Sequence, residues 1–373
     1  MQVRKATISD YHIVMSICNR NGLNLLMNQE KWIKFWKLNP YIIKNPDFPI
    51  GWILNNDNGD SVGVKINIPL VYELNGHRLL GVAGSSWAVD DQYRKASFLL
   101  VMKYFQQKNV DFFMNTTANK ASGAIFLAFK AKKIPCLSYD QVLLWIIDYV
   151  SFAKSALLKK RIPLVRILQY PAGFILWFIN QVLSYNYWNK ISTKVVHLKS
   201  FDQRFDVFWE KLRKKSDRLL AMRDQVTLNW HFHIARSKEE TVILSYLEGD
   251  AIVGYLILAS DYNKEINLKR FQIIDFQLLE ENFDIAKDLL YEALQHSKKS
   301  GASIVECVGF SGMKRDYLER LSLHRRKLVP YPFYFKPALK GESVLDNSAI
   351  WDPCSYDGDT SLFSIVQSLN EKT

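Results

Sequence analysis

The sequence has few cysteines, and they are not arranged in pairs. Among 373 residues there are four, namely Cys18, Cys136, Cys307 and Cys354. No two of them show the two-residue spacing of zinc-binding or redox motifs. This scarcity argues against a zinc knuckle and against a dense disulfide framework, and it favours a reducing compartment. No metal site is predicted.

Two further signals are missing. The first fifteen residues, MQVRKATISDYHIVM, lack the apolar core of a secretory signal peptide. A Gly-x-Ser-x-Gly elbow is also absent, which argues against a serine hydrolase. Because the signal-peptide core is missing, we expect a protein that acts in the cytoplasm or at the inner face of the membrane.

The composition that is present is that of a globular protein. Hydrophobic residues make up 48% and charged residues 23%, and the length favours two domains. A formal net charge of +12 attracts polyanions, among them phosphorylated cofactors, nucleic acids and anionic membranes. Charge alone does not choose among these, and we do not expect nucleic acid to be the partner.

Two stretches of the chain share one order of predicted elements. In each, a hairpin leads into a strand, a helix and another strand, as in a repeated α+β unit. Residues 1–145 carry the hairpin turn Asn75-Gly76, and residues 200–373 carry Glu248-Gly249-Asp250. We therefore predict an α+β fold of two similar domains, each with a mixed, mostly antiparallel sheet flanked by helices.

A connector over residues 146–199 joins the two predicted domains. Its residues 167–189 carry no charge, and basic residues flank them on both sides. Its amide side chains make it a poor membrane-spanning helix, and Pro171 with Gly173 is expected to interrupt its first turns. We favour a helix or hairpin buried between the domains. The alternative is a helix in the headgroup region of a membrane, with contact through residues 159–194.

One strand and the turn after it carry a family resemblance. Residues 87–97 read Trp-Ala-Val-Asp-Asp-Gln-Tyr-Arg-Lys-Ala-Ser and precede an amphipathic helix. This resembles the GNAT (acyl-CoA N-acyltransferase) superfamily, in which an apolar strand leads to Tyr-Arg-Gly-x-Gly-x-Gly and a helix. Tyr93 and Arg94 match the pattern. The glycines are replaced by Lys95, Ala96 and Ser97.

The resemblance implies a site for acetyl-CoA or another acyl-CoA. Backbone N–H groups at the start of such a helix hold the pyrophosphate, and the preceding strand pairs with the pantetheine arm. Basic side chains add charge-assisted contacts. The implied cofactor-binding residues are Trp87, Ala88, Val89, Tyr93, Arg94, Lys95, Ala96, Ser97 and Asn119.

The second half of the family pattern is kept in part. Members have Asn-x-x-Ala/Ser after the next strand and a Tyr seven residues beyond the Asn. Here residues 119–122 read Asn-Lys-Ala-Ser, and the seventh residue is Phe126. Asn119 bonds the pantetheine arm or caps the helix. Because Phe126 has no hydroxyl to protonate the departing thiolate, another group or water serves, or the domain does not catalyse this reaction.

The second domain departs further from the pattern. Its corresponding turn reads Glu280-Glu281, and two carboxylates at a helix start repel a pyrophosphate. We therefore expect one cofactor site, in the first domain. Residues 229–232 (Asn-Trp-His-Phe) and 351–360 resemble stretches of tandem GNAT proteins, some of which are similar to enzymes of surface-polysaccharide assembly.

Two residues near the proposed site are candidates for catalysis. Glu73 precedes the Asn75-Gly76 turn and is a candidate base for the acceptor ammonium. Ser86 precedes Trp87 on the strand that leads to the cofactor loop. Each also has a structural interpretation, Glu73 as a solvent-facing hairpin residue and Ser86 as part of the core or of a splayed strand.

The sequence thus predicts an acyl-CoA-dependent N-acyltransferase. Its acceptor is an amino group of a small molecule or an amino sugar, with surface-glycan synthesis as one setting, bound between the two domains. Two alternatives stay open. One is a Fem-like aminoacyl transferase that uses aminoacyl-tRNA, favoured by the basic charge and disfavoured by the missing helical arm. The other is a degenerate GNAT pair that binds a ligand, a membrane or a partner without catalysis.

Overall fold

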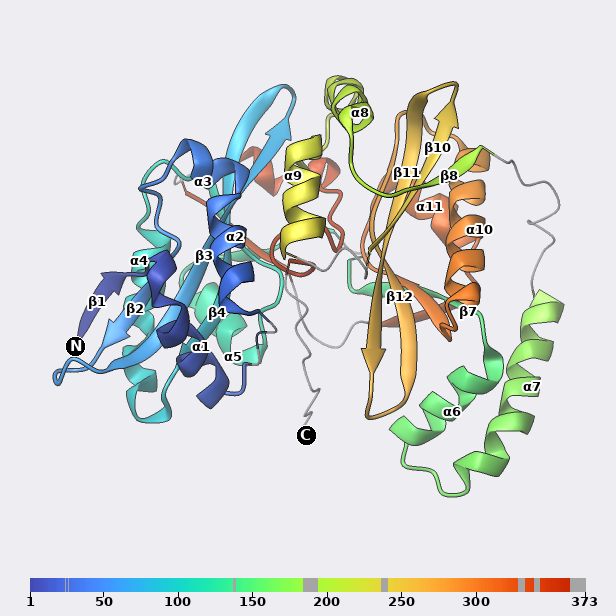
Figure 1. Cartoon of the computed structure of the whole chain (residues 1–373), viewed down its shortest axis with the longest axis horizontal. Coiled ribbons are helices and arrows are strands. Elements are labelled where there is room, and N and C mark those ends of the chain that lie inside the picture. Colours follow the sequence, from blue (N-terminus) through green and yellow to red (C-terminus); the bar gives the residue numbers. More distant parts are fainter. Residues whose placement is uncertain are drawn as a thin grey trace.

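The computed structural model describes residues 1–23, 25, 27–136, 139–183, 194–235, 241–327, 333–338 and 343–362. Over these residues the protein has two halves that lie side by side, each with its own sheet (Figure 1). Both sheets are mixed, mostly antiparallel and flanked by helices. The α+β class and the two-unit architecture predicted from the sequence are therefore confirmed.

The first sheet follows the order β1-β2-β3-β4-β5-β15-β6. Its strands are β1 (Gln2–Lys5), β2 (Gly51–Asn55), β3 (Ser61–Leu74), β4 (His77–Val89), β5 (Phe112–Asn115), β6 (Lys132–Lys133) and β15 (Tyr334–Pro337), with β9 (Leu220–Ala221) paired to β3. β3 and β4 form the long hairpin predicted around Asn75-Gly76. Both turn residues have positive φ, 51° and 78°, as a type I′ turn requires. β4 and β5 run parallel.

Helices cover both faces of this sheet. Buried residues of α1 (Tyr11–Arg20) and α2 (Gln29–Lys37) join the large core that extends into the second half. The short α3 (Pro40–Lys44) follows, capped by Asn39. On the other face, α4 (Ser97–Phe105) and α5 (Lys120–Ala128) enclose a separate apolar cluster. The sheet of the first half is thus buried on both sides.

The second sheet follows the order β14-β7-β13-β12-β11-β10-β8. Its strands are β7 (Gln141–Ile146), β8 (Val195–Leu198), β10 (Thr241–Glu248), β11 (Ala251–Asn263), β12 (Leu268–Leu278), β13 (Ile304–Cys307) and β14 (His324–Lys327). Its helices are α8 (Gln203–Lys215), α9 (Gln225–Asn229), which continues into a π-helical turn at Trp230–Ala235, α10 (Phe283–Lys299) and α11 (Gly312–Arg320). β12 and β13 run parallel, as β4 and β5 do in the first half.

The two halves exchange strands. Most of β7 lies before residue 145, the predicted end of the first domain. It nevertheless pairs with β13 and β14 of the second sheet. β15 comes from the last sixth of the chain and pairs with β5 and β6 of the first sheet. The predicted boundaries therefore do not coincide with the membership of the sheets, because local sequence does not reveal which distant strand an edge will accept.

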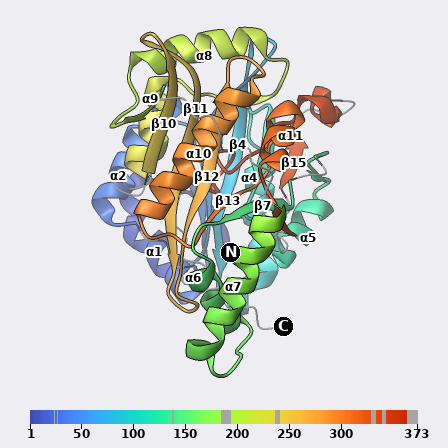
Figure 2. The ribbon, with the colours of Figure 1, turned by 90° about the vertical axis from the view of Figure 1, so that its right-hand side faces the viewer.

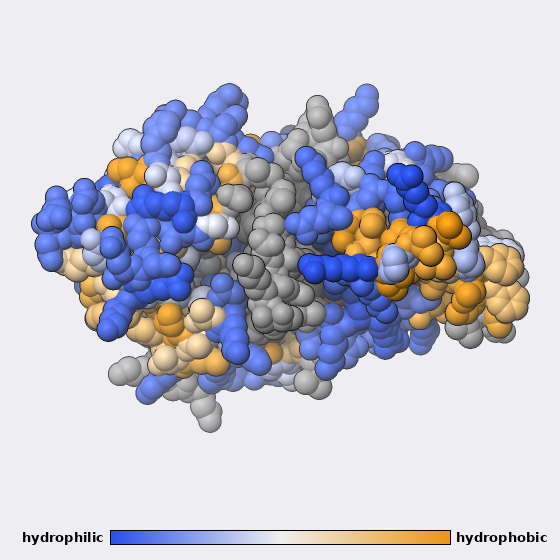
Figure 3. Space-filling model, turned by 90° about the horizontal axis from the view of Figure 1, so that it is seen from below, coloured by the Kyte–Doolittle hydropathy of each residue, from blue (hydrophilic) through white to orange (hydrophobic). Residues whose placement is uncertain are grey.

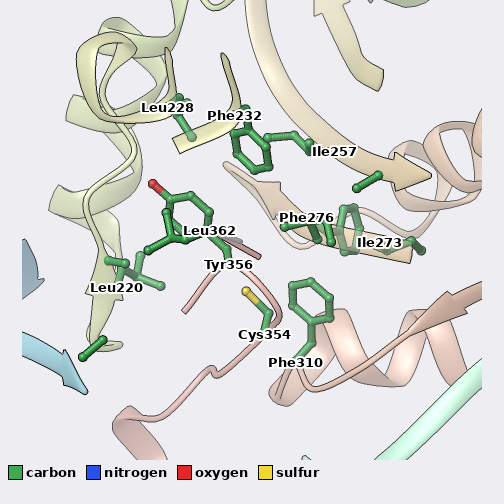
Figure 4. Packing of buried hydrophobic residues seen from close by; sticks show 14 of the residues in the cluster. Leu220, Leu228, Phe232, Ile257, Ile273, Phe276, Phe310, Cys354, Tyr356 and Leu362 are labelled. Carbon is green, nitrogen blue, oxygen red and sulfur yellow. The ribbon is translucent and has the colours of Figure 1, made fainter. Parts of the chain in front are cut away.

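Residues 351–362, which we call the inserted segment, run between the two halves and are buried except for Thr360 (Figure 1). Figure 4 shows Cys354, Tyr356 and Leu362 among apolar side chains of the second half. The Tyr356 hydroxyl donates to Met222 O at 2.7 Å. The inserted segment thus occupies the region between the halves where the acceptor was expected to lie.

A helical hairpin projects from the second half. It consists of α6 (Tyr149–Lys159) and α7 (Val165–Leu183), and Figure 2 shows it extending beyond the ends of the sheets. α7 is continuous through Pro171, so the expected interruption is wrong. Its apolar residues are largely exposed, so the favoured interpretation of a segment buried between the domains is also wrong. Across the described ranges, no helix combines the length and apolar character needed to cross a bilayer.

Candidate functional site

β4 and β5 separate at the centre of the first sheet. Their parallel register ends where Ala83 is opposite Met114. β5 ends at Asn115, whereas β4 continues to Val89 along β3. A bulge in the pairing with β3 puts Ser86 at a φ of 45°, in the left-handed region. The bulge and the separation place Ser86, Trp87, Ala88 and Val89 on a stretch of β4 that β5 does not cover.

The predicted cofactor loop lies directly after this stretch. Residues Asp91–Ala96 form a 3-10 turn, and α4 begins at Ser97 with no side chain capping its first amides among the described residues. Arg94 and Lys95 are exposed. Arg94 pairs with Asp91 at 2.5 Å, an exposed contact of the kind that contributes little to stability. The Ser97 N–H bonds Arg94 O within the turn, so the anion-binding character of this helix start rests on the two exposed cations and the helix dipole.

Two other predicted cofactor residues have structural contacts. The Tyr93 hydroxyl accepts a hydrogen bond from Asn56 Nδ2 at 3.2 Å, which holds the loop against the β2–β3 turn. Asn119 caps α5, because its Oδ1 accepts from the Ser122 N–H at 3.0 Å. Of the two roles considered for Asn119, the structure shows the cap.

Glu73 lies away from this region. It is opposite Arg78 in the β3–β4 ladder, whereas Ser85 is opposite Ile66, seven residues along β3. At about 3.3 Å per residue the two positions are roughly 23 Å apart. Glu73 is also buried and paired with Arg213 of α8 at 2.7 Å, so the expectation of a solvent-facing residue is wrong. The structure brings Ser86, but not Glu73, to the point where β4 and β5 separate.

The inserted segment supplies a carboxylate that sequence reasoning missed. Asp359 is fully buried, and its Oδ1 accepts from Thr116 Oγ1 at 2.8 Å. Thr117 Oγ1 lies 3.1 Å from Oδ2, and Ser85 also donates to this carboxylate. Burial raises the pKa of Asp359, and these three hydrogen bonds lower it in part. Because Ser85 is on β4 and both threonines follow β5, Asp359 bridges the two strands where they separate.

An amine lies nearby on β3. Lys65 Nζ sits over the rings of Trp87, Tyr104 and Phe126, at 5.0, 4.5 and 5.3 Å from their centroids. The side chain is fully buried, and its Nζ has no hydrogen-bond partner within the described part of the chain. Burial lowers the pKa of Lys65 to about 7, and the charge of Asp359 acts in the opposite direction. Lys65 is thus a buried amine that titrates near neutral pH.

Lys65 and Asp359 lie on opposite faces of the first sheet. A Cβ atom added at Gly84 would lie 2.7 Å from Lys65 Nζ. The next side chain, Ser85, bonds Asp359 instead, and successive side chains of a strand point to opposite faces. The Tyr104 hydroxyl closes the same point on the lysine side, at 2.7 Å from Val82 O and 2.9 Å from Met114 O.

The second half has an equivalent strand separation, where two pairs of opposite buried charges lie in contact. The parallel register of β12 and β13 ends at Ile273 and Cys307. Beyond it, Arg223 pairs with Asp275 at 2.9 Å, and both side chains are fully buried. Lys314 Nζ contacts Asp352 at 2.5 Å, Gln277 Oε1 at 3.0 Å and Phe276 O at 3.1 Å.

The N-terminus of α10, the helix that follows β12, is unfavourable for binding an anion. Asn282 Oδ1 accepts from the first amides of α10, those of Asp284 and Ile285. Glu280 pairs with Lys215 at 3.0 Å. Within the described residues of this half, no buried lysine amine lacks a hydrogen bond as Lys65 Nζ does. A single cofactor site in the first half stays a prediction.

The sequence held a signal for Lys65 but none for Asp359. Lys65 is the one charged residue in the apolar run of residues 61–68. A charge there must be buried or mark the edge of the sheet, and it could have been singled out on that ground. Asp359 lies in a polar stretch far from β4, and only the fold brings it to Ser85. Among the described residues, no group of His, Cys, Asp and Glu side chains is arranged to hold a metal ion.

By sequence, the chain matches no protein-family model and no curated protein. By structure, it is similar to a GCN5-related N-acetyltransferase from Anabaena variabilis, at a TM-score of 0.56 and 11% identity over 91% of this chain and 73% of that chain. Saccharomyces cerevisiae N-myristoyltransferase with bound myristoyl-CoA gives 0.53 and 11% over 90% and 78%. A probable N-acyltransferase from Enterococcus faecalis gives 0.56 and 11% over 90% and 72%.

Proposed function

We propose that this protein, which has the fold of the GNAT-type N-acyltransferases, transfers an acyl group from acyl-CoA to an amino group. The acceptor amine belongs to a small molecule or an amino sugar. The observation that carries the proposal is the pair of buried titratable groups, Lys65 and Asp359, at the point where β4 and β5 separate. Acids and bases tuned toward neutral pH are what acyl transfer to an amine needs.

The first half offers a place for the donor. The pyrophosphate of acyl-CoA binds next to the start of α4, where the helix dipole and the exposed Arg94 and Lys95 favour an anion. The pantetheine arm follows the uncovered stretch of β4 from Val89 toward Ser85. Trp87 is the half-buried member of the ring set around Lys65, so the thioester reaches Lys65 by displacing this indole.

The two groups have complementary roles in the transfer. The neutral acceptor nitrogen attacks the thioester carbonyl carbon, and Asp359 takes the proton that this nitrogen loses. As the C–S bond breaks, the Lys65 ammonium gives a proton to the departing thiolate. The products are the amide and the free thiol of CoA. As the products leave, Asp359 gives its proton to water and Lys65 takes one from water, which restores the starting state, so the cycle balances.

This assignment accounts for Phe126. The phenylalanine stands where the resemblance puts a hydroxyl-bearing acid, and its ring lies 5.3 Å from Lys65 Nζ. An ammonium beside the ring can serve as the acid that Phe126 cannot provide. A thiol with a pKa of roughly 8.5 is also close enough to that of Lys65 for efficient proton transfer.

The full chain tests the proposal directly. Release of CoA thiol and product mass are measured with acyl-CoAs from acetyl to myristoyl against a panel of amines and amino sugars. Binding of each acyl-CoA is measured by calorimetry. We expect an acylated amine, and Asp359→Asn should lower turnover roughly 10²-fold or more, because a general base is lost.

The matched control is Asp357→Asn, which changes another buried carboxylate of the inserted segment. It should leave turnover within a small factor of wild type. Asp359→Asn that turns over normally would remove the base assignment. Acyl-CoA binding without product on any amine would instead identify the non-catalytic GNAT pair that the lost glycines favour.

A further inference from the structure

On α7 the apolar side chains face outward, and the small and polar ones face the rest of the protein. Its outward face carries large apolar side chains, with exposed fractions of 65% for Ile167, 62% for Phe174, 56% for Phe178 and 66% for Val182. Exposed apolar patches of this kind mark interaction sites. Figure 3 shows the resulting hydrophobic surface at the end of the molecule where α6 and α7 lie.

The opposite face of α7 carries the small and polar residues. Gly173 is buried against α6, where a Cβ would lie 2.9 Å from Val150 Cα. Asn180 hydrogen-bonds Tyr149 at the start of α6. The helix is thus anchored through its small and amide residues, and its apolar face is left to the outside. This arrangement stabilises the protein only if something apolar covers that face.

The charged residues of the α6–α7 hairpin indicate what kind of surface covers the apolar face of α7. Residues 149–183 contain no Asp or Glu. Their charged residues are Lys154, Lys159, Lys160, Arg161 and Arg166. Lys159, Lys160, Arg161 and Arg166 are all exposed near the turn that joins the two helices. An apolar face next to a turn that carries four cations and no acid complements an anionic lipid surface. The exposed Asp148, which caps α6, lies at the other end of the hairpin.

Aromatic residues with polar groups lie at the border between the two zones. Tyr170 and Trp177 are exposed on α7, and such rings settle at the depth of the headgroups. With Phe174, with Asp148 before α6 and with Lys298 from the last turn of α10, they line a pocket of about 470 Å³ between the hairpin and the second half. A cation beside apolar rings suits a lipid whose phosphate stays near the surface.

We propose that the α6–α7 hairpin docks this protein on an anionic membrane surface, with α7 lying in the plane of the headgroups. The proposal does not depend on acyl transfer. A second copy of the chain fits less well, because residues 149–183 of a partner copy would offer these cations no Asp or Glu to pair with.

Flotation of the full chain with lipid vesicles tests this. We expect binding to vesicles of phosphatidylcholine mixed with phosphatidylglycerol, weaker binding to phosphatidylcholine alone, and weakening by salt. Phe174→Asp with Phe178→Asp should lower vesicle affinity roughly tenfold or more, because two rings that the membrane would bury become charges. Lys159→Ala with Lys160→Ala should weaken binding to the anionic vesicles only.

The matched control is Val207→Asp with Val226→Asp on α8 and α9. These side chains are 54% and 58% exposed, so the control adds the same charge at exposed apolar sites elsewhere. It should bind vesicles as the wild type does. Equal binding by the Phe174 and Phe178 variant would overturn the proposal. The proposal would also be overturned if light scattering showed a wild-type dimer that the Phe174 and Phe178 variant dissociates, and if that dimer did not bind vesicles.

Discussion

Lys65 and Asp359 face each other through the first sheet at the point where β4 and β5 stop pairing. Burial lowers the pKa of the lysine to about 7 and raises that of the aspartate, so both groups move toward neutral pH. Their charges attract, yet no direct contact joins them among the described residues. The second half resolves the same strand separation with paired charges, as Lys314 and Asp352 show. The difference makes Lys65 the residue whose replacement is most informative.

Lys65→Met should stabilise the protein near neutral pH, because it removes a buried amine that lacks a hydrogen bond. The expected gain is about 1–3 kcal/mol, after a part is offset by the lost cation–π contacts. The folded pKa of about 7 lies below the ordinary value of 10.5, so the unfolded chain binds more protons between these values. Wild-type stability should therefore rise with pH through this window.

Denaturant unfolding of both proteins from pH 6 to pH 10 measures this difference. The advantage of Lys65→Met should be full below pH 7 and shrink toward pH 10. A loss of stability on replacement, or a pH-independent difference, would show that Lys65 is held by contacts that keep it charged.

Phe126→Tyr should rescue part of the turnover lost in Lys65→Met. The single Lys65 change should slow acyl transfer by roughly 10²-fold, the usual contribution of a general acid. A tyrosine at position 126 places a second proton donor beside the same rings. Turnover of the double variant is compared with each single variant under saturating acyl-CoA. Identical rates with and without the hydroxyl would count against a role for Lys65 in thiolate protonation.

Arg94→Ala with Lys95→Ala should weaken CoA binding by roughly 1.5–3 kcal/mol for each side chain that contacts phosphate. Both side chains are exposed, so the fold should not change. Glu280→Ala with Glu281→Ala, at the equivalent turn of the second half, is the control and should leave the dissociation constant as it is. Calorimetry with CoA decides, and an unchanged affinity in the Arg94 variant would remove the loop as the pyrophosphate site.

Arg223→Met should destabilise the protein by about 3–5 kcal/mol, because it leaves the buried Asp275 carboxylate without its cation. That carboxylate also accepts from Tyr255 at 2.7 Å and from Gln277 at 3.0 Å. Adding Asp275→Leu should recover much of the loss. Thermal unfolding of the single and double variants gives the coupling, and additive losses would show that the two charges do not act as a pair.

The sequence by itself determined the local elements and their order. Alternating apolar runs and the Asn75-Gly76 turn indicated the β3–β4 hairpin, and Asn119 marked the start of α5, because these signals act over a few residues. The basic turn at Arg94 and Lys95 was likewise visible as a candidate anion site. The uncharged residues 167–189 were interpreted as a helix or hairpin buried between the domains, whereas the described part is an exposed helix.

Only the tertiary structure decided which distant segments meet. β7 and β15 cross between the halves, and Asp359 reaches Ser85 from the other end of the chain. Such pairings depend on loop closure and on packing against surfaces built elsewhere, and no local pattern encodes them. For the same reason the sequence suggested that Glu73 is an exposed hairpin residue, although it is buried in a pair with Arg213. The local sequence therefore determines the helices and strands and their order. The packing of the two sheets against each other determines which residues meet at the candidate site.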